Sequence, residues 1–203
     1  FYKEGRLDSI LSKANEGDYL FISFGHNDRW QSADPSSPDI IRYTNPYGSV
    51  EDDETNENDP SFKYYLNKYV TGAREKGVIP VLITPIPEHN FINGVLSDTG
   101  IDAYANAMIE FAEEMQVPLV DLRKAMQDKI TDMGEENSKT LFMIFNKTEY
   151  AGDTLFETSR YYTMLDKDGN YYDKTHIRRS GSEFCAEYIV QNLEQQHLLQ
   201  NNK

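Results

Sequence analysis

Apolar residues alternate along the chain between two kinds of spacing. Positions three or four apart, which mark one buried face of a helix, recur in the segments 7–14, 62–76, 101–115 and 182–199. Short, nearly continuous apolar runs, typical of strands covered on both faces, occupy residues 19–24, 78–84 and 117–122. Because strands separated by helices form parallel βαβ units, the sequence predicts an α/β fold with a doubly wound parallel sheet. We expect a single domain over residues 1–203.

Two segments interrupt this alternation. Residues 29–60 are rich in Pro, Asp, Asn and Ser and include "EDDETNENDP", for which we expect a solvated loop rather than a cation site. Residues 161–175 are interpreted as two short extended pieces joined by a turn at Asp168-Gly169-Asn170. Their "DKDGN" is similar to the start of a calcium loop, but Ile177 stands where such a loop has its last glutamate. We therefore expect no metal site.

The net charge and composition argue against several classes of partner. The formal charge of -14 repels phosphate backbones and anionic lipids, so neither nucleic acid nor a membrane surface is an expected partner. No apolar run is long enough to span a bilayer, and no signal-like segment is seen. The one cysteine, Cys185, excludes an intrachain disulfide, and we interpret it as a buried structural thiol.

The first candidate site follows the strand 19–24, in Gly25-His26-Asn27-Asp28. Ligands of open parallel sheets bind beyond the carboxyl ends of the strands, where this loop must lie. Gly25 allows a close turn of the backbone, and the Asn27 amide can donate to an oxyanion. The alternative is a strand-end turn in which Asn27 and Asp28 bond neighbouring backbone groups.

The second candidate site is the pair Asp173 and His176, three residues apart in "YDKTHIRRSGSE". In a turn or first helical turn, the carboxylate can hold the imidazole Nδ1–H and leave Nε2 free as a base. A capping interaction at the start of the last helix would explain the same spacing.

Together the two motifs resemble the SGNH (GDSL-type) hydrolases, in particular the rhamnogalacturonan acetylesterase branch. The segments that carry the likeness occur in that branch's order and extend over essentially the whole chain: "EGRLDSIL", "GDYLFISFGHND", "RYTNPYGS", "GVIPVLITPI", "VPLVDL" and "DKTHIRRSGSE". Two departures are local, namely "PEHNF" at 87–91, where the branch is more basic, and the acidic insertion before residue 62. The resemblance implies a flavodoxin-like sheet, the SGNH hydrolase fold.

The family's Gly-Asp-Ser motif, which supplies the nucleophilic serine, and its oxyanion-hole glycine block have no counterpart here. Asp8-Ser9 lies on the helix before the strand 19–24, the wrong element for an exposed nucleophile. We therefore expect the chain, which starts at Phe1, to lack the family's N-terminal strand. The edge of the strand 19–24 would then be open, so we expect an upstream segment or a partner chain to cover it.

The resemblance implies a secreted or periplasmic serine esterase that deacetylates a plant cell-wall polysaccharide, most simply pectic rhamnogalacturonan, and needs no metal or organic cofactor. It assigns His176 as the base, Asp173 as the residue that orients it, and Asn27 as an oxyanion donor, with Gly25 supporting the loop. Lacking the serine, the chain alone is expected to be inactive. Arg42 and Tyr43 could contact the substrate or equally anchor their loop.

Functions of other classes remain open. A non-catalytic carbohydrate-binding or scaffold protein would suit the missing serine and the 14 Tyr, 10 Phe and one Trp, although most of these aromatic residues fall on core positions. An acidic, calcium-dependent adhesion module would need stabilisation by cations.

Overall fold

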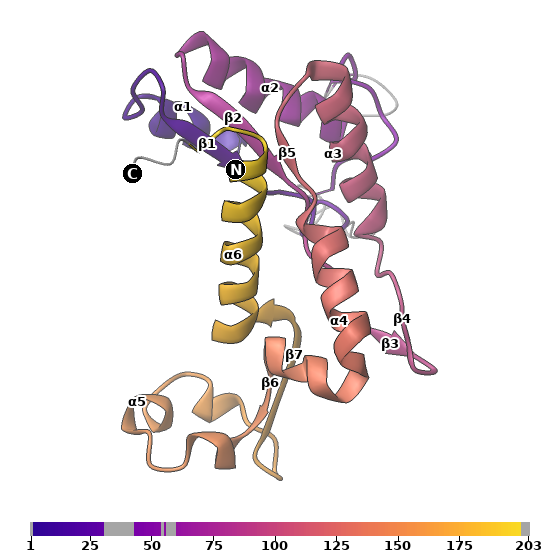
Figure 1. Cartoon of the computed structure of the whole chain (residues 1–203), viewed down its shortest axis with the longest axis vertical. Coiled ribbons are helices and arrows are strands. Elements are labelled where there is room, and N and C mark those ends of the chain that lie inside the picture. Colours follow the sequence, from indigo (N-terminus) through magenta and orange to yellow (C-terminus); the bar gives the residue numbers. More distant parts are fainter. Residues whose placement is uncertain (1, 31–42, 54, 56–59, 200–203) are drawn as a thin grey trace. The chain divides into compact units, whose positions relative to one another are not determined.

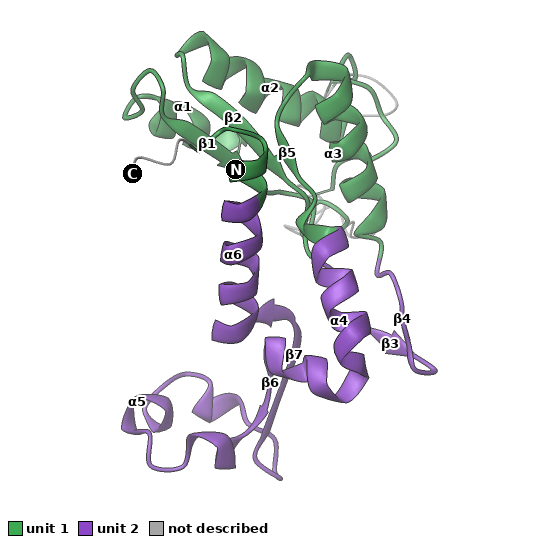
Figure 2. Ribbon diagram, in the orientation of Figure 1, with its two compact units in different colours: residues 1–86, 100–123, 192–203 green, residues 87–99, 124–191 purple. Residues whose placement is uncertain are grey.

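The computed structural model of this protein describes residues 2–30, 43–53, 55 and 60–199. The chain forms two compact units (Figure 2), the first made of residues 1–86, 100–123 and 192–203 and the second of 87–99 and 124–191. The expectation of a single domain stays a prediction.

A three-stranded parallel sheet organises the first unit, in the order β1-β2-β5 (Figure 1). The strands are β1 (Tyr19–Ile22), β2 (Ile79–Ile83) and β5 (Leu119–Val120). The apolar runs therefore predicted all three strands, though each is shorter than its run. The central strand β2 is buried from Pro80 to Ile83, as expected where both faces of a sheet are covered.

Among the described residues β1 pairs with β2 only, so no strand lies beside its other edge. Phe21 on this strand is 48% exposed, which is unusual for an apolar residue in a parallel sheet. The expectation that an upstream segment or a partner chain covers the edge stays a prediction.

Three helices of the first unit arise where the helical spacing predicts them: α1 (Arg6–Leu11), α2 (Phe62–Glu75) and α3 (Asp102–Met115), preceded by the 3-10 turn η1 (Tyr2–Glu4). The Ser61 hydroxyl caps α2 by accepting a hydrogen bond from the Tyr64 N–H, and α3 ends at Gln116 in the left-handed region. The apolar stripes form one core with the sheet, including Leu66, Val70, Leu82, Met108 and Phe111.

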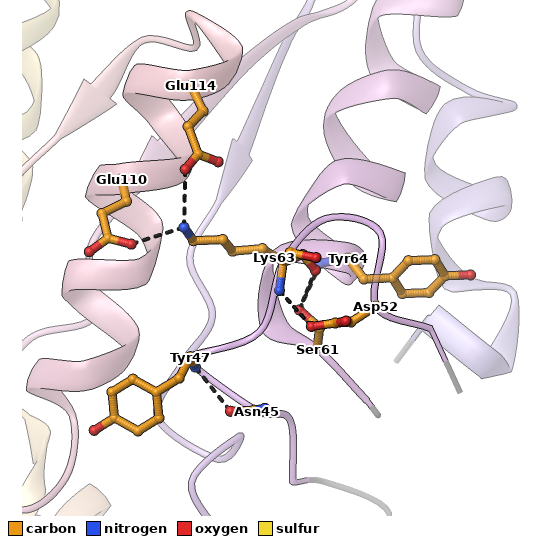
Figure 3. Close-up of polar contacts among 9 residues, drawn as sticks. Asn45, Tyr47, Asp52, Ser61, Lys63, Tyr64, Glu110 and Glu114 are labelled. Atoms are coloured by element: carbon orange, nitrogen blue, oxygen red, sulfur yellow. Dashed lines mark hydrogen bonds and ion pairs between the residues drawn. The ribbon is translucent and has the colours of Figure 1, made fainter. Parts of the chain in front are cut away.

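One buried cation lies among these helices. Lys63 on α2 donates to Glu110 at 2.9 Å and to Glu114 at 3.3 Å, both on α3 (Figure 3). Its side chain is 9% exposed, whereas the two carboxylates remain largely in water. The ammonium is thus buried with paired charge, which fixes α2 against α3.

The second unit is built around an antiparallel pair, β6 (Phe142–Asn146) and β7 (Asn170–Ile177). A short hairpin of β3 (Phe91–Ile92) and β4 (Val95–Leu96) belongs to the same unit. The remaining elements are α4 (Leu122–Ser138), η3 (Lys139–Leu141), η4 (Lys147–Tyr150), α5 (Thr154–Glu157), η5 (Tyr162–Met164) and α6 (Arg179–Gln195), of which α4 starts in the first unit and α6 ends there. The helix α4 is interrupted at Gly134, whose φ of 72° is not helical.

Residues 147–169, the excursion between β6 and β7, start and end at neighbouring positions that are joined by hydrogen bonds. The Lys147 N–H donates to the Gly169 carbonyl at 2.8 Å, and the Asn146 side chain donates to the Asp168 carbonyl and the Asn170 side chain. Within the excursion, Phe156 stacks on Tyr150 and contacts Phe145 and Tyr162 edge-on.

The structure corrects the prediction for residues 161–175. The turn at 168–170 exists, with Gly169 at a φ of 82°, but β7 pairs with β6 and not with residues before the turn. Residues 162–164 form a 3-10 turn because Tyr161 and Tyr162 pack against Tyr171 and Phe156. The carboxylate of Asp166 accepts the N–H groups of Asp168 and Asn170, so it organises the turn itself.

Two further expectations are tested by burial and by helix bounds. Cys185 is buried, as predicted, and burial raises the pKa of its thiol to about 11. The last helix begins at Arg179, three residues before the predicted start, and ends at Gln195. Helix α4 and strand β6 were not predicted. No helix in the described part of the chain is both long and apolar enough to cross a membrane.

Candidate active site

The predicted pairing of Asp173 with His176 is present at the end of β7. The His176 Nδ1 lies 2.7 Å from Asp173 Oδ2, while Asp173 Oδ1 accepts the N–H groups of Thr175 at 2.9 Å and His176 at 3.0 Å. Because Nδ1–H donates to the carboxylate, Nε2 is the ring nitrogen that can accept a proton. The pair has the arrangement of an oriented general base.

Burial and hydrogen bonding shift the pKa of Asp173 in opposite directions. Partial burial favours the neutral acid, but hydrogen bonds from the backbone of His176 and Thr175 and from the imidazole together hold the pKa of this carboxyl below its usual range. The side chain of Asp173 is 22% exposed and that of His176 is 77% exposed. An ionised carboxylate is therefore fixed behind an accessible imidazole.

A bulge in β7 creates this geometry. Asp173 pairs with Met143 and Ile177 with Phe142, so three residues of β7, namely Lys174, Thr175 and His176, stand opposite no residue of β6. Bulges leave backbone groups unpaired and redirect side chains. Here the Asp173 carboxylate receives two of the unpaired N–H groups, which brings His176 back to it.

The other candidate loop, Gly25–Asp28, lies at the carboxyl end of β1 in the first unit. The Asn27 side chain is exposed, and no hydrogen bond joins it to the other described residues. Its amide is therefore free to donate to a ligand. The Asp28 carboxylate has a different part: it accepts the Gly25 N–H at 2.9 Å and the Thr44 hydroxyl at 3.2 Å, so it closes the turn.

Steric contact explains the glycine of this loop. Gly25 has a φ of 117°, and a Cβ there would lie 3.0 Å from both Pro85 Cγ and Tyr104 Cβ. The close approach that we expected of Gly25 is thus made to the protein core. Burial raises the pKa of Asp28 above its usual value, against the lowering effect of its hydrogen bond from Gly25.

Of the two predicted substrate contacts, Arg42 falls outside the described residues. Tyr43 is half-buried, and the next residue, Thr44, donates its N–H to the Asp28 carbonyl at 3.0 Å. The segment of Tyr43 therefore adjoins the Asn27 loop. Gly25, Asn27 and Tyr43 belong to the first unit, whereas Asp173 and His176 belong to the second.

Motif reasoning missed the groups that surround the bulge. Glu88 and His89 are buried to 6% and 2% exposure and contact Thr175 and Lys174. The one sign of these two residues in the sequence is the departure "PEHNF" at 87–91, which places a glutamate and a histidine shortly after the predicted strand 78–84. Among the described residues, no three His, Cys, Asp or Glu side chains gather as metal ligands would.

The parallel α/β sheet of the first unit is that of the SGNH hydrolase fold. Residues 3–138 match the GDSL-like Lipase/Acylhydrolase family, and the chain belongs to that family. The expected resemblance and the SGNH fold are thereby confirmed.

Two relatives from Bacillus subtilis (strain 168) are similar to the chain over most of its length. It is 40% identical to the probable rhamnogalacturonan acetylesterase YesY over 144 residues, and this alignment covers 71% of the chain and 58% of YesY. It is 31% identical to the rhamnogalacturonan acetylesterase RhgT over 196 residues, and this alignment covers 96% of the chain and 68% of RhgT. The chain thus spans about three fifths to two thirds of the length of these two relatives.

Solved structures agree on the fold. YxiM of Bacillus subtilis matches with a TM-score of 0.62 at 22% identity, over 96% of this chain and 41% of that one. Axe2, an acetylxylan esterase from Geobacillus stearothermophilus, matches with a TM-score of 0.53 at 15% identity, over 94% of this chain and 65% of its own. At these identities the likeness concerns the fold alone.

Proposed function

We propose that this protein is a carbohydrate acetylesterase in which His176 is the general base and Asp173 orients it. The observation that carries the proposal is the 2.7 Å contact between His176 Nδ1 and Asp173 Oδ2, with the imidazole exposed in front of the carboxylate. Two relatives named as rhamnogalacturonan acetylesterases support acetylated rhamnogalacturonan as the substrate. Since this is an extracellular polysaccharide, the proposal includes export from the cell.

In the proposed reaction, His176 Nε2 takes the proton of a serine hydroxyl as the serine oxygen attacks the acetyl carbonyl. Asp173 supports the imidazolium that forms. The Asn27 amide donates to the oxyanion of the tetrahedral intermediate. The proton then passes to the departing sugar oxygen, and water, activated by the same imidazole, hydrolyses the acetyl-enzyme. The sequence has no Gly-Asp-Ser motif, so the proposal places the serine outside these 203 residues.

The test is acetate release from acetylated rhamnogalacturonan by the complete protein, with acetylated xylan as the competing substrate. We expect His176→Asn to lower turnover by a factor on the order of 10⁶, as loss of the base does in a serine hydrolase. Asn27→Ala is expected to lower it by about 10² to 10³, the usual effect of one oxyanion donor.

A matched control is His197→Asn, which makes the same change at an exposed histidine and should leave turnover unchanged. His197 has a φ of 59°, a conformation that asparagine tolerates. Wild-type turnover in His176→Asn would refute the base assignment. Binding of the polysaccharide without acetate release would favour the non-catalytic carbohydrate-binding function.

A further inference from the structure

The bulge of β7 needs partners for its backbone beyond those that Asp173 supplies. Asp173 Oδ1 receives the N–H groups of Thr175 and His176, and the Lys174 carbonyl accepts the His89 N–H at 2.8 Å. A segment of the chain more than eighty residues away therefore completes the bulge. Residues 88–90 lie along the two residues that separate Asp173 from His176.

Glu88 contacts the side chains of this bulge. Its Oε1 accepts the Thr175 hydroxyl at 2.9 Å, and its Oε2 lies 3.8 Å from the Lys174 ammonium, which also donates to Asn90 Oδ1 at 2.9 Å. The Glu88 side chain is 6% exposed. A buried carboxylate is costly unless it is paired and hydrogen-bonded, and Thr175 and Lys174, which contact this carboxylate, lie on the bulge.

The opposite side of the segment is anchored by His89. Its ring Nε2 lies 3.0 Å from the Glu135 carbonyl and 3.0 Å from the Ser138 hydroxyl, at the end of α4. The ring also packs against Phe91 and Phe142, with centroids 5.0 and 5.4 Å away. Glu88 therefore presents its carboxylate from a fixed backbone.

Thr175 links this support to the acid–base pair. Its N–H donates to Asp173 Oδ1 while its hydroxyl donates to Glu88, so the two contacts fix the same residue from two directions. If the hydroxyl contact is lost, Thr175 can rotate away and take one of the donors of the Asp173 carboxylate with it. The carboxylate that holds the imidazole would then lose its own orientation.

We propose that Glu88 is a positioning residue for the Asp173–His176 pair: through the Thr175 hydroxyl it holds the bulge in the one form that keeps His176 Nδ1–H on the carboxylate. This inference rests on the proposed esterase function for its kinetic consequence, but the geometry can be measured without any substrate.

The experiment compares Thr175→Val, Glu88→Met and the double variant in the complete protein. Thr175→Val removes the hydroxyl contact alone, whereas Glu88→Met also removes the pairing with Lys174 at 3.8 Å. Each should lower kcat about tenfold or more with KM unchanged, and the double variant should be no slower than Glu88→Met. Thr175→Ser restores the hydroxyl and should restore kcat. Thr131→Val, the same change at an exposed position of α4, is the matched control and should leave kcat unchanged.

A second measurement follows the imidazole directly. Nitrogen-15 NMR of the four histidines reports the tautomer of His176, identified by the signal lost in His176→Asn. The wild type should hold the Nδ1–H tautomer, and Thr175→Val and Glu88→Met should show a mixture of both. A role in folding alone would lower Tm without changing the tautomer.

The outcomes separate the two proposals. Unchanged kcat and an unchanged tautomer in Thr175→Val and Glu88→Met, or strictly additive losses in the double variant, would overturn the positioning role while acetate release stands. A changed tautomer in a protein that releases no acetate would uphold the positioning role and remove the proposed function.

Discussion

Replacing Tyr104 with phenylalanine tests how the Asn27 loop is held. The Tyr104 side chain is 2% exposed, and its hydroxyl lies 2.8 Å from both the Asp28 and the Thr44 carbonyl oxygens. Burial raises the pKa of this phenol, so it remains a neutral donor. Tyr104→Phe removes one oxygen and leaves the ring, with its edge-on contact to Phe62, in place.

The expected loss in the free energy of unfolding depends on which hydrogen-bond donors the two carbonyl groups retain. The Asp28 carbonyl keeps the Thr44 N–H at 3.0 Å, whereas the buried Thr44 carbonyl is left without its donor from Tyr104. An orphaned buried acceptor costs about 1 to 3 kcal/mol in the free energy of unfolding. At about 2 to 4 °C per kcal/mol for a chain of this size, a cost of about 2 kcal/mol lowers Tm by roughly 4 to 8 °C.

Thermal unfolding followed by circular dichroism measures this shift, and amide exchange at Thr44 should accelerate with it. The control is Tyr47→Phe, because the Tyr47 side chain is 87% exposed and its substitution should change stability by less than about 0.5 kcal/mol. Equal Tm values for Tyr104→Phe and Tyr47→Phe would contradict the reasoning.

Two further predictions concern His89 and Gly25. Burial lowers the pKa of His89, so the unfolded chain binds its proton more readily, and stability should be lost as pH falls below about 6.5, by up to about 1.4 kcal/mol per pH unit. His89→Gln keeps a donor but does not titrate, so guanidinium unfolding from pH 7 to 5 should show a shallower loss, and parallel curves would exclude the effect. Gly25→Ala forces a Cβ against Pro85 and Tyr104 at a positive φ and should cost about 1 to 3 kcal/mol by the same assay. Gly94→Ala, also at a positive φ but with no atom within 4 Å of its Cβ, isolates the backbone contribution, and equal costs for the two would refute the clash.

The sheet of the first unit could be predicted from the sequence because its signals are local. A run such as residues 78–84 is apolar because both faces of β2 are covered, and the stripe of α2 reflects the one core that it joins. The ends of these elements depend on caps such as Ser61 and were less accurate.

The second unit was predicted poorly because its order depends on contacts between distant residues. The strand β6 is a short apolar run whose partner, β7, begins more than twenty residues later, after the aromatic excursion. The spacing of Asp173 and His176 predicted their contact. The bulge that produces it follows from the pairing with Phe142 and Met143, and the Glu88 contact joins residues 87 positions apart, so neither leaves a local pattern.

The closure of the 147–169 excursion has a consequence for how this protein can vary. Side chains alternate along β7, so a slip of one residue in its pairing would turn Asp173 to the other face of the strand. The contacts of Asn146 with Asp168 and Asn170 fix the pairing at the point where the excursion starts and ends. An insertion or a grafted peptide between residues 157 and 160, which leaves the aromatic contacts of Phe156 with Phe145 and of Tyr161 with Tyr171 in place, can therefore enlarge the excursion while the carboxylate at position 173 keeps its direction.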